Sequence, residues 1–220
     1  MMIFARRKLV LLALPKTGTT ALEAALGPLA DIHMRGAPAL KHTTLRRYRR
    51  FIRPYLATAG IEGLETACLL REPTAWLRSW HAYRRRPALD GKPKSAAGLS
   101  FAEFVDAYLS DPQPVFAQVG VPSRFVAGPD GSPGVDHLFR YEDQGAFQAF
   151  LEDRLERKID LPRRNVSPPA DAEPLPPALQ ARLERERAAD FALYRSLGRP
   201  RSEPASASRS SAKLRARAAR

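Results

Sequence analysis

Lys16 stands in a stretch whose residue types suit phosphate binding, PKTGTT at residues 15–20. The apolar run of residues 8–14 precedes it, and the helix-favouring ALEAAL follows it. A strand, a tight polar loop and a helix start, in that order, aim backbone N–H groups at a phosphate. The usual ATP-binding pattern G-x-x-x-x-G-K-[ST] is absent, because Lys16 precedes Gly18 by two residues. The sequence therefore predicts a phosphate-binding loop whose phosphate need not belong to ATP.

A second stretch, LLREPTAWLRSWHAYR at residues 69–84, offers further phosphate ligands. Arg71 follows an apolar run that ends at Leu70, and Ser79 lies in the helix expected next. The guanidinium group presents a planar fork of donors to a phosphate. Ligands of parallel α/β sheets bind at the carboxyl ends of the strands, where both stretches would meet. A ligand with phosphates at two positions would use both loops.

Together these motifs resemble those of the sulfotransferases that use 3′-phosphoadenosine 5′-phosphosulfate (PAPS) as sulfuryl donor. PKTGTT is similar to their first loop, and Arg71, Pro73 and Ser79 match the pattern R-x-P with a Ser six residues after the Pro. LFRYEDQGAFQAFL (138–151) and LPRRNVSP (161–168) are similar to the C-terminal part of bacterial members. The resemblance spans residues 9 to about 196. One departure is Trp76, where many members carry a second Arg that Arg78 or the cluster 84–86 would replace.

The resemblance implies a fold and a set of roles. The fold is a three-layer α/β arrangement, similar to that of P-loop NTPases, with a central parallel sheet. Lys16 would neutralise the bridging oxygen of PAPS as sulfur leaves it. The 5′-phosphate would be held by backbone N–H groups of residues 17–20 and by two hydroxyls, and the 3′-phosphate by Arg71 and Ser79. No divalent metal is expected. The residues implied for the nucleotide are Lys16, Thr17, Gly18, Thr19, Thr20, Arg71 and Ser79.

A general base should take the proton of the acceptor hydroxyl. His42, in ALKHTT, is the first candidate because it follows the first helix where family members often place such a group. His33 and then Glu62 are the alternatives.

Other conspicuous residues have mainly structural interpretations. The aromatic residues of the Ser79 helix favour core packing over stacking on adenine, and RYED (140–143) favours a buried ion pair over catalysis. A basic loop after residue 160 is open between a structural role and contact with cofactor or acceptor. The aromatic residues are Trp76, Trp80 and Tyr83, and the loop residues are Arg163, Arg164, Asn165 and Ser167.

The order of strand and helix patterns predicts an α/β fold. MMIFARRKLVLLALP at the N-terminus is interpreted as the first core strand and not as a secretory signal. Ser100 and Glu103 predict a capping box, and Pro54 interrupts a helical pattern. Strands are expected at 8–14, 64–70 and 135–142, helices at 19–27, 43–58, 74–86, 101–109, 144–155 and 175–197, a mobile loop at 86–99 and turns at 127–135.

Length and composition limit the domain organisation and the kinds of site that the chain can form. The 220 residues suit one domain, expected at 1–197, and carry a net charge of +13. Residues 198–220 carry seven basic residues against one Glu and predict a basic disordered tail. The single Cys68 excludes an internal disulfide and a cysteine metal site. No stretch is long and apolar enough for a membrane span, so the expected location is the cytoplasm.

Three rival functions stay open. A nucleotide kinase-like P-loop protein would need Lys and Ser/Thr after a second Gly, which the chain lacks. A non-enzymatic protein that binds polyanions would need only the charge, and an inactive sulfotransferase would need the loss of a motif residue. The expected partner is a sulfate acceptor, a carbohydrate or glycolipid hydroxyl first and another small molecule second, and not a nucleic acid.

Overall fold

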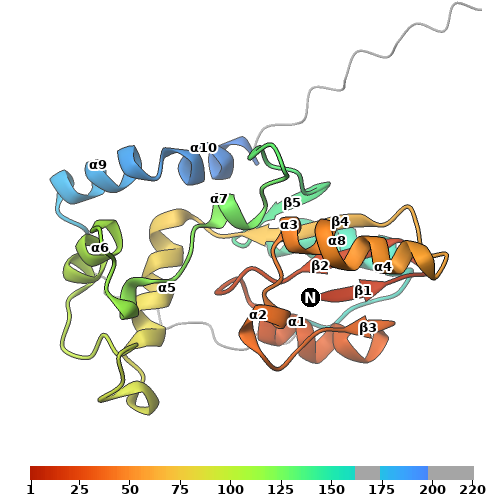
Figure 1. The fold of residues 1–220 in the computed structure, drawn as a ribbon, viewed down its shortest axis with the longest axis horizontal. Coiled ribbons are helices and arrows are strands. Elements are labelled where there is room, and N and C mark those ends of the chain that lie inside the picture. Colours follow the sequence, from red (N-terminus) through yellow and green to blue (C-terminus); the bar gives the residue numbers. More distant parts are fainter. Residues whose placement is uncertain (162–173, 198–220) are drawn as a thin grey trace, which may run out of the picture.

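A computed structural model describes residues 1–161 and 174–197 of the chain. Its centre is a five-stranded mixed sheet in the order β3-β1-β2-β4-β5 (Figure 1). β2, β4 and β5 run parallel to one another, with Leu12 beside Cys68 and Leu70 beside Arg140. β1 runs antiparallel to both β2 and β3. The strands are β1 Met2–Phe4, β2 Leu9–Leu12, β3 Ile32–His33, β4 Glu65–Leu70 and β5 His137–Arg140.

The sequence prediction of one N-terminal strand and a wholly parallel sheet is wrong at the N-terminus. Residues 2–12 form a hairpin of β1 and β2. Two hydrogen bonds close its turn: the Arg7 N–H donates to the Phe4 carbonyl and the Lys8 N–H to the Ala5 carbonyl, each at 3.1 Å. Lys8 takes a left-handed φ of 49°. Three consecutive cations, residues 6–8, interrupt the apolar run, and charged groups are costly to bury in a central strand. The chain therefore turns there.

Helices cover both faces of the sheet (Figure 1). On one face, side chains of α3, α4, α7 and α10 pack with Val10, Leu12 and Leu70. On the other, α1 and α8 pack with Leu9, Leu11 and Leu69. α5 Pro73–Arg84, α6 Phe101–Leu109 and α9 Pro177–Glu186 form a third cluster beside the sheet. The α-helices of the two faces are α1 Thr19–Leu26, α3 Leu45–Arg47, α4 Arg53–Thr58, α7 Pro122–Phe125, α8 Gln144–Leu155 and α10 Ala188–Ser196.

The helix expected over 43–58 is present, but its turn just before Pro54 is π-helical instead of α-helical. Between α3 and α4 lies a π-helical turn, Tyr48–Ile52, in which the Arg53 N–H donates to the carbonyl of Tyr48. A proline ring clashes with the carbonyl four residues earlier and donates no hydrogen bond. The wider π turn accommodates the ring while the helix continues.

Other helix ends also differ from the sequence expectation. α5 Pro73–Arg84 begins one residue before Thr74, capped by the Glu72 carboxylate that accepts from the Ala75 N–H at 2.6 Å. The capping box of α6 Phe101–Leu109 is confirmed. The last helix is split into α9 Pro177–Glu186 and α10 because the Arg187 backbone leaves the helical conformation. The Arg187 guanidinium lies 4.7 Å from the Tyr108 ring centroid. The remaining elements are α2 Pro38–Lys41, η1 Gly27–Leu29, η3 Pro87–Leu89 and η4 Val115–Ala117.

Two kinds of feature are absent from the described ranges. No helix among residues 1–161 and 174–197 has the length and apolar character needed to cross a membrane. Within the same ranges, His, Cys, Asp and Glu side chains form no group of three that could hold a metal ion. The predicted loop at 163–167 and the tail at 198–220 lie outside the described residues.

Candidate functional site

The loop between β2 and α1 has an unusual backbone. Lys16 and Gly18 both take left-handed conformations, with φ of 70° and 72°. A lysine rarely adopts such a φ, and where it does the surrounding structure must hold it there. Gly18 is the N-cap of α1 and supplies no side-chain cap to its first turn. Since no side chain of the described residues caps this helix start, its amide groups suit a ligand or water.

Side chains from three elements fix the loop. The Thr17 hydroxyl donates to the Leu14 carbonyl at 2.8 Å, and the Trp76 indole N–H donates to the Pro15 carbonyl at 2.9 Å. A Cβ added to Gly18 would lie 3.2 Å from the Tyr141 ring. Gly18 is thus needed both for its φ and for its contact with Tyr141. Trp76 is 2% exposed and packs in the core, as predicted.

The Lys16 ammonium lies among aromatic rings and other cations. It is 4.5 Å from the centroid of the Tyr83 ring and 5.7 Å from that of Trp80. The Arg86 guanidinium is 4.7 Å from the same Tyr83 ring, and that of Arg84 is 5.1 Å from the Trp80 ring. Burial, and then repulsion by Arg86, Arg71 and Arg84, lowers the pKa of Lys16 to about 8.

Arg71 reaches the loop from the end of β4. Its Nη1 donates to the Lys16 carbonyl at a long 3.5 Å, and its guanidinium stacks 4.9 Å from the Tyr141 ring centroid. Its Nε is buried and has no hydrogen-bond partner among the residues that the structure describes. A buried donor without a partner is costly, so Arg71 has capacity left for an acceptor.

Four cations therefore converge on one edge of the sheet, and the described residues supply no counter-ion there. In the described part of the chain, no carboxylate lies within ion-pair distance of Lys16, Arg71, Arg84 or Arg86. Mutual repulsion makes such a cluster unfavourable by itself. It suits a ligand with several negative charges.

Ser79 occupies the same helix as the aromatic residues of the site. It lies three residues after Trp76 and four before Tyr83, a spacing that puts all three on one face of α5. Its exposed fraction is 9%. The face of α5 that carries Ser79 is therefore the face turned to the Lys16 loop. Thr19 is also buried, at 8% exposed, and Thr20 is exposed.

No family model matches the chain, and neither the curated proteins nor the solved structures contain a match.

The three candidate bases lie in different places. The His42 Nδ1 is 2.7 Å from the Ala13 carbonyl, just before the loop. A carbonyl only accepts, so Nδ1 carries the proton and Nε2 keeps its lone pair. Burial lowers the pKa of His42 and favours this neutral form. His33 lies on β3, two strands from β2. Glu62 is exposed and precedes β4, so it lies at the amino ends of the parallel strands, away from the Lys16 loop. Of the three, the structure brings His42 to the loop.

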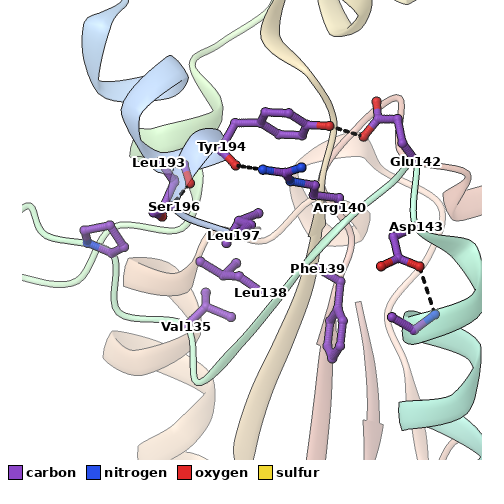
Figure 2. A pocket seen from close by; sticks show the side chains of 12 residues that line it. Val135, Leu138, Phe139, Arg140, Glu142, Asp143, Leu193, Tyr194, Ser196 and Leu197 are labelled. Carbon is purple, nitrogen blue, oxygen red and sulfur yellow. Dashed lines mark hydrogen bonds between the residues drawn. The ribbon is translucent and has the colours of Figure 1, made fainter. Parts of the chain in front are cut away.

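A cavity of about 730 Å³ adjoins this edge at the end of β5 (Figure 2). Leu138, Leu193 and Leu197 line its apolar part. The Arg140 Nη2 donates to the Tyr194 carbonyl at 3.3 Å, and the Tyr194 hydroxyl donates to Glu142 at 2.8 Å. The predicted ion pair within RYED is thus wrong, because Arg140 and Glu142 each contact Tyr194 instead.

Sequence reasoning missed Tyr141, which covers both Gly18 and Arg71. The available signal was its position, since it directly follows β5 and the carboxyl ends of neighbouring parallel strands share one edge. The Lys16 contact of Tyr83 was also missed, because core packing was the preferred interpretation of that ring.

Proposed function

We propose that this protein is a sulfotransferase that moves the sulfuryl group of PAPS to an acceptor hydroxyl. The observation that carries the proposal is the convergence of Lys16 and Arg71, from two parallel strands, in a cluster of cations that has no carboxylate partner among the described residues. PAPS and its product carry phosphates at two positions and match two sets of cationic ligands. The left-handed loop at the start of α1 supports the same assignment through its amide groups.

Each residue then has one role. The acceptor oxygen attacks sulfur, the bond from sulfur to the bridging oxygen breaks, and 3′-phosphoadenosine 5′-phosphate leaves. His42 Nε2 takes the proton of the acceptor hydroxyl, and the Lys16 ammonium stabilises the charge that develops on the bridging oxygen. Arg71 and Ser79 bind the 3′-phosphate. The amide groups of Thr17, Gly18, Thr19 and Thr20 bind the 5′-phosphate.

The proposed acceptor is the hydroxyl of a carbohydrate or glycolipid. The cavity in Figure 2 combines an apolar floor with Arg140, Glu142 and Tyr194 at its rim, a lining suited to a molecule with both apolar and hydroxyl-bearing parts. It adjoins the cation cluster because the Glu72 N–H, next to Arg71, donates to Glu142 at 3.2 Å.

Calorimetric titration with 3′-phosphoadenosine 5′-phosphate and with 5′-AMP tests the proposal. We expect tight binding of the first and much weaker binding of the second, because only the first carries a 3′-phosphate for Arg71. Equal affinities would refute the assignment. ATP with Mg²⁺ serves as the control for a kinase-like protein, and heparin at rising salt for a polyanion-binding protein, whose affinity would fall steeply. An acceptor screen with labelled PAPS follows.

A further inference from the structure

One face of the helix over α3, the π turn and α4 is exposed and has an unusual composition. Phe51 is 61% exposed and Tyr55 is 70% exposed, and they lie one turn apart. Few large apolar side chains of the described residues are so exposed. The opposite face of the same helix is buried against the sheet through Leu45, Tyr48 and Leu56. The aromatic pair therefore belongs to the outer surface and not to the core.

The same outer face carries a concentration of positive charge. Four arginines lie on it, and residues 43–60 contain no Asp or Glu. None of the four forms an ion pair with a carboxylate of residues 1–161 or 174–197, and the Arg50 guanidinium stacks 5.1 Å from the Phe51 ring centroid. We call this surface the arginine-aromatic face; its residues are Arg46, Arg47, Arg50, Phe51, Arg53 and Tyr55.

We propose that the arginine-aromatic face binds the surface of an anionic lipid bilayer. A helix that lies in the membrane interface combines apolar or aromatic side chains with basic ones, and its charge attracts acidic headgroups. Aromatic rings favour the headgroup level, where one side is apolar and the other is wet. Phe51 and Tyr55 would enter that level while the arginines bind the headgroup phosphates.

The shape of the face favours a bilayer over a nucleic acid. Proteins that bind single strands guide the backbone through a charged groove. Here α3 and α4 lie across the outside of one sheet face (Figure 1), and cavities of about 730 and 650 Å³ in the described residues are lined by other elements. A convex helix matches a broad flat partner. The proposal is independent of the nucleotide site and would also bring the protein to a lipid-linked acceptor.

Co-sedimentation of the full chain with vesicles tests this binding. We expect binding to phosphatidylcholine vesicles that contain phosphatidylserine, and little binding to phosphatidylcholine alone. Arg50→Gln with Arg53→Gln should lower the partition coefficient by about fivefold per arginine. The matched control is Arg6→Gln with Arg157→Gln, which removes the same charge from exposed positions outside the face and should change binding much less. Phe51→Ser with Tyr55→Ser should remove the binding that persists at high salt.

Three results would overturn the proposal: no binding to the phosphatidylserine vesicles, equal losses in the two arginine pairs, or a loss of oligonucleotide binding in Arg50→Gln with Arg53→Gln while vesicle binding stays unchanged. Melting temperature and affinity for 3′-phosphoadenosine 5′-phosphate should be unaltered in every variant. That measurement separates this proposal from the proposed enzymatic function.

Discussion

The charged residues at the two ends of β4 differ in whether they form ion pairs. At the carboxyl end, Arg71 meets Lys16 and two further arginines, with no carboxylate in ion-pair distance among the described residues. At the amino end, Glu65 pairs with His137 at 2.9 Å and with Arg154. Among the described residues, the charges at the carboxyl end of β4 thus lack an ion-pair partner, and those at its amino end have one.

This difference distinguishes charges that stabilise the fold from charges that are available to bind a ligand. Paired groups such as Glu65 and Arg154 contribute to folding, although modestly at an exposed position. Cations that repel one another, as the three arginines around Lys16 do, cost folding energy until an anion neutralises them. Substitutions at the carboxyl edge should therefore change ligand binding, and those at the amino edge should change stability.

Lys16→Ala should have the largest effect. If the ammonium stabilises charge that develops on the bridging oxygen, turnover should fall by roughly 10²-fold or more. Affinity for the desulfated nucleotide should fall far less, and Lys16→Arg should not fully restore turnover, because a planar fork poorly replaces a compact charge. Steady-state kinetics and calorimetry on the same variant measure both quantities.

Lys8→Ala is the matched control for Lys16. Lys8 also has a left-handed φ, 49°, but lies at the other end of β2. It should leave turnover unchanged. If Lys16→Ala lowers turnover and affinity by the same factor, Lys16 is a binding residue only.

Arg71→Ala should weaken the binding of 3′-phosphoadenosine 5′-phosphate about tenfold or more, the effect of losing a charge-assisted contact of roughly 1.5–3 kcal/mol. The stability of the Arg71→Ala variant should change little, because removing the guanidinium also relieves repulsion on Lys16. Arg154→Ala is the control from the paired edge and should lower the melting temperature without changing nucleotide affinity. A loss of stability in Arg71→Ala together with a loss of nucleotide affinity in Arg154→Ala would contradict the contrast between the two ends of β4.

Nucleotide affinity should fall as pH rises above about 8. The lowered pKa of Lys16 means that the ammonium is present below about 8 and is lost above it. The phosphates are already fully ionised there, so Lys16 is the group that titrates. The decline should stay below tenfold per pH unit, the limit for one coupled proton, and should level off at the affinity of Lys16→Ala. Calorimetry of wild type and Lys16→Ala across this range measures it. An equally steep decline in Lys16→Ala would assign the titration to another group.

Glu65→Gln should have the smallest effect, a loss of about 0.5–1 kcal/mol in the free energy of unfolding near neutral pH, since the side chain is 45% exposed and solvent screens the pair. Hydrogen bonds from His137 and then Arg154 lower the pKa of Glu65. Its contribution is therefore full above the ordinary value of 4.5 and is lost as pH falls through the lowered pKa. Urea unfolding at several pH values measures the difference. A stability gap that persists in acid would show that packing, not charge, is responsible.

Several elements were predictable because their signals are local. The apolar run of residues 65–70, the capping box at Ser100 and Glu103, and the start of α1 after Gly18 depend on neighbouring residues. The hairpin at the N-terminus was not predicted, although the cations of residues 6–8 marked its turn. Strand direction depends on pairing between distant segments, here β1 with both β2 and β3, and a local pattern does not encode it.

The sequence by itself determined that Lys16, Gly18 and Arg71 follow apolar strands, because residue order alone places a polar loop after each run. Only the tertiary structure decided which groups surround them. Tyr141 covers Gly18 because β5 pairs beside β4, and Arg84 and Arg86 approach Lys16 because α5 folds back onto the loop through Trp76. The lowered pKa of Lys16 is a property of that assembly, since burial and through-space repulsion act between residues far apart in the chain.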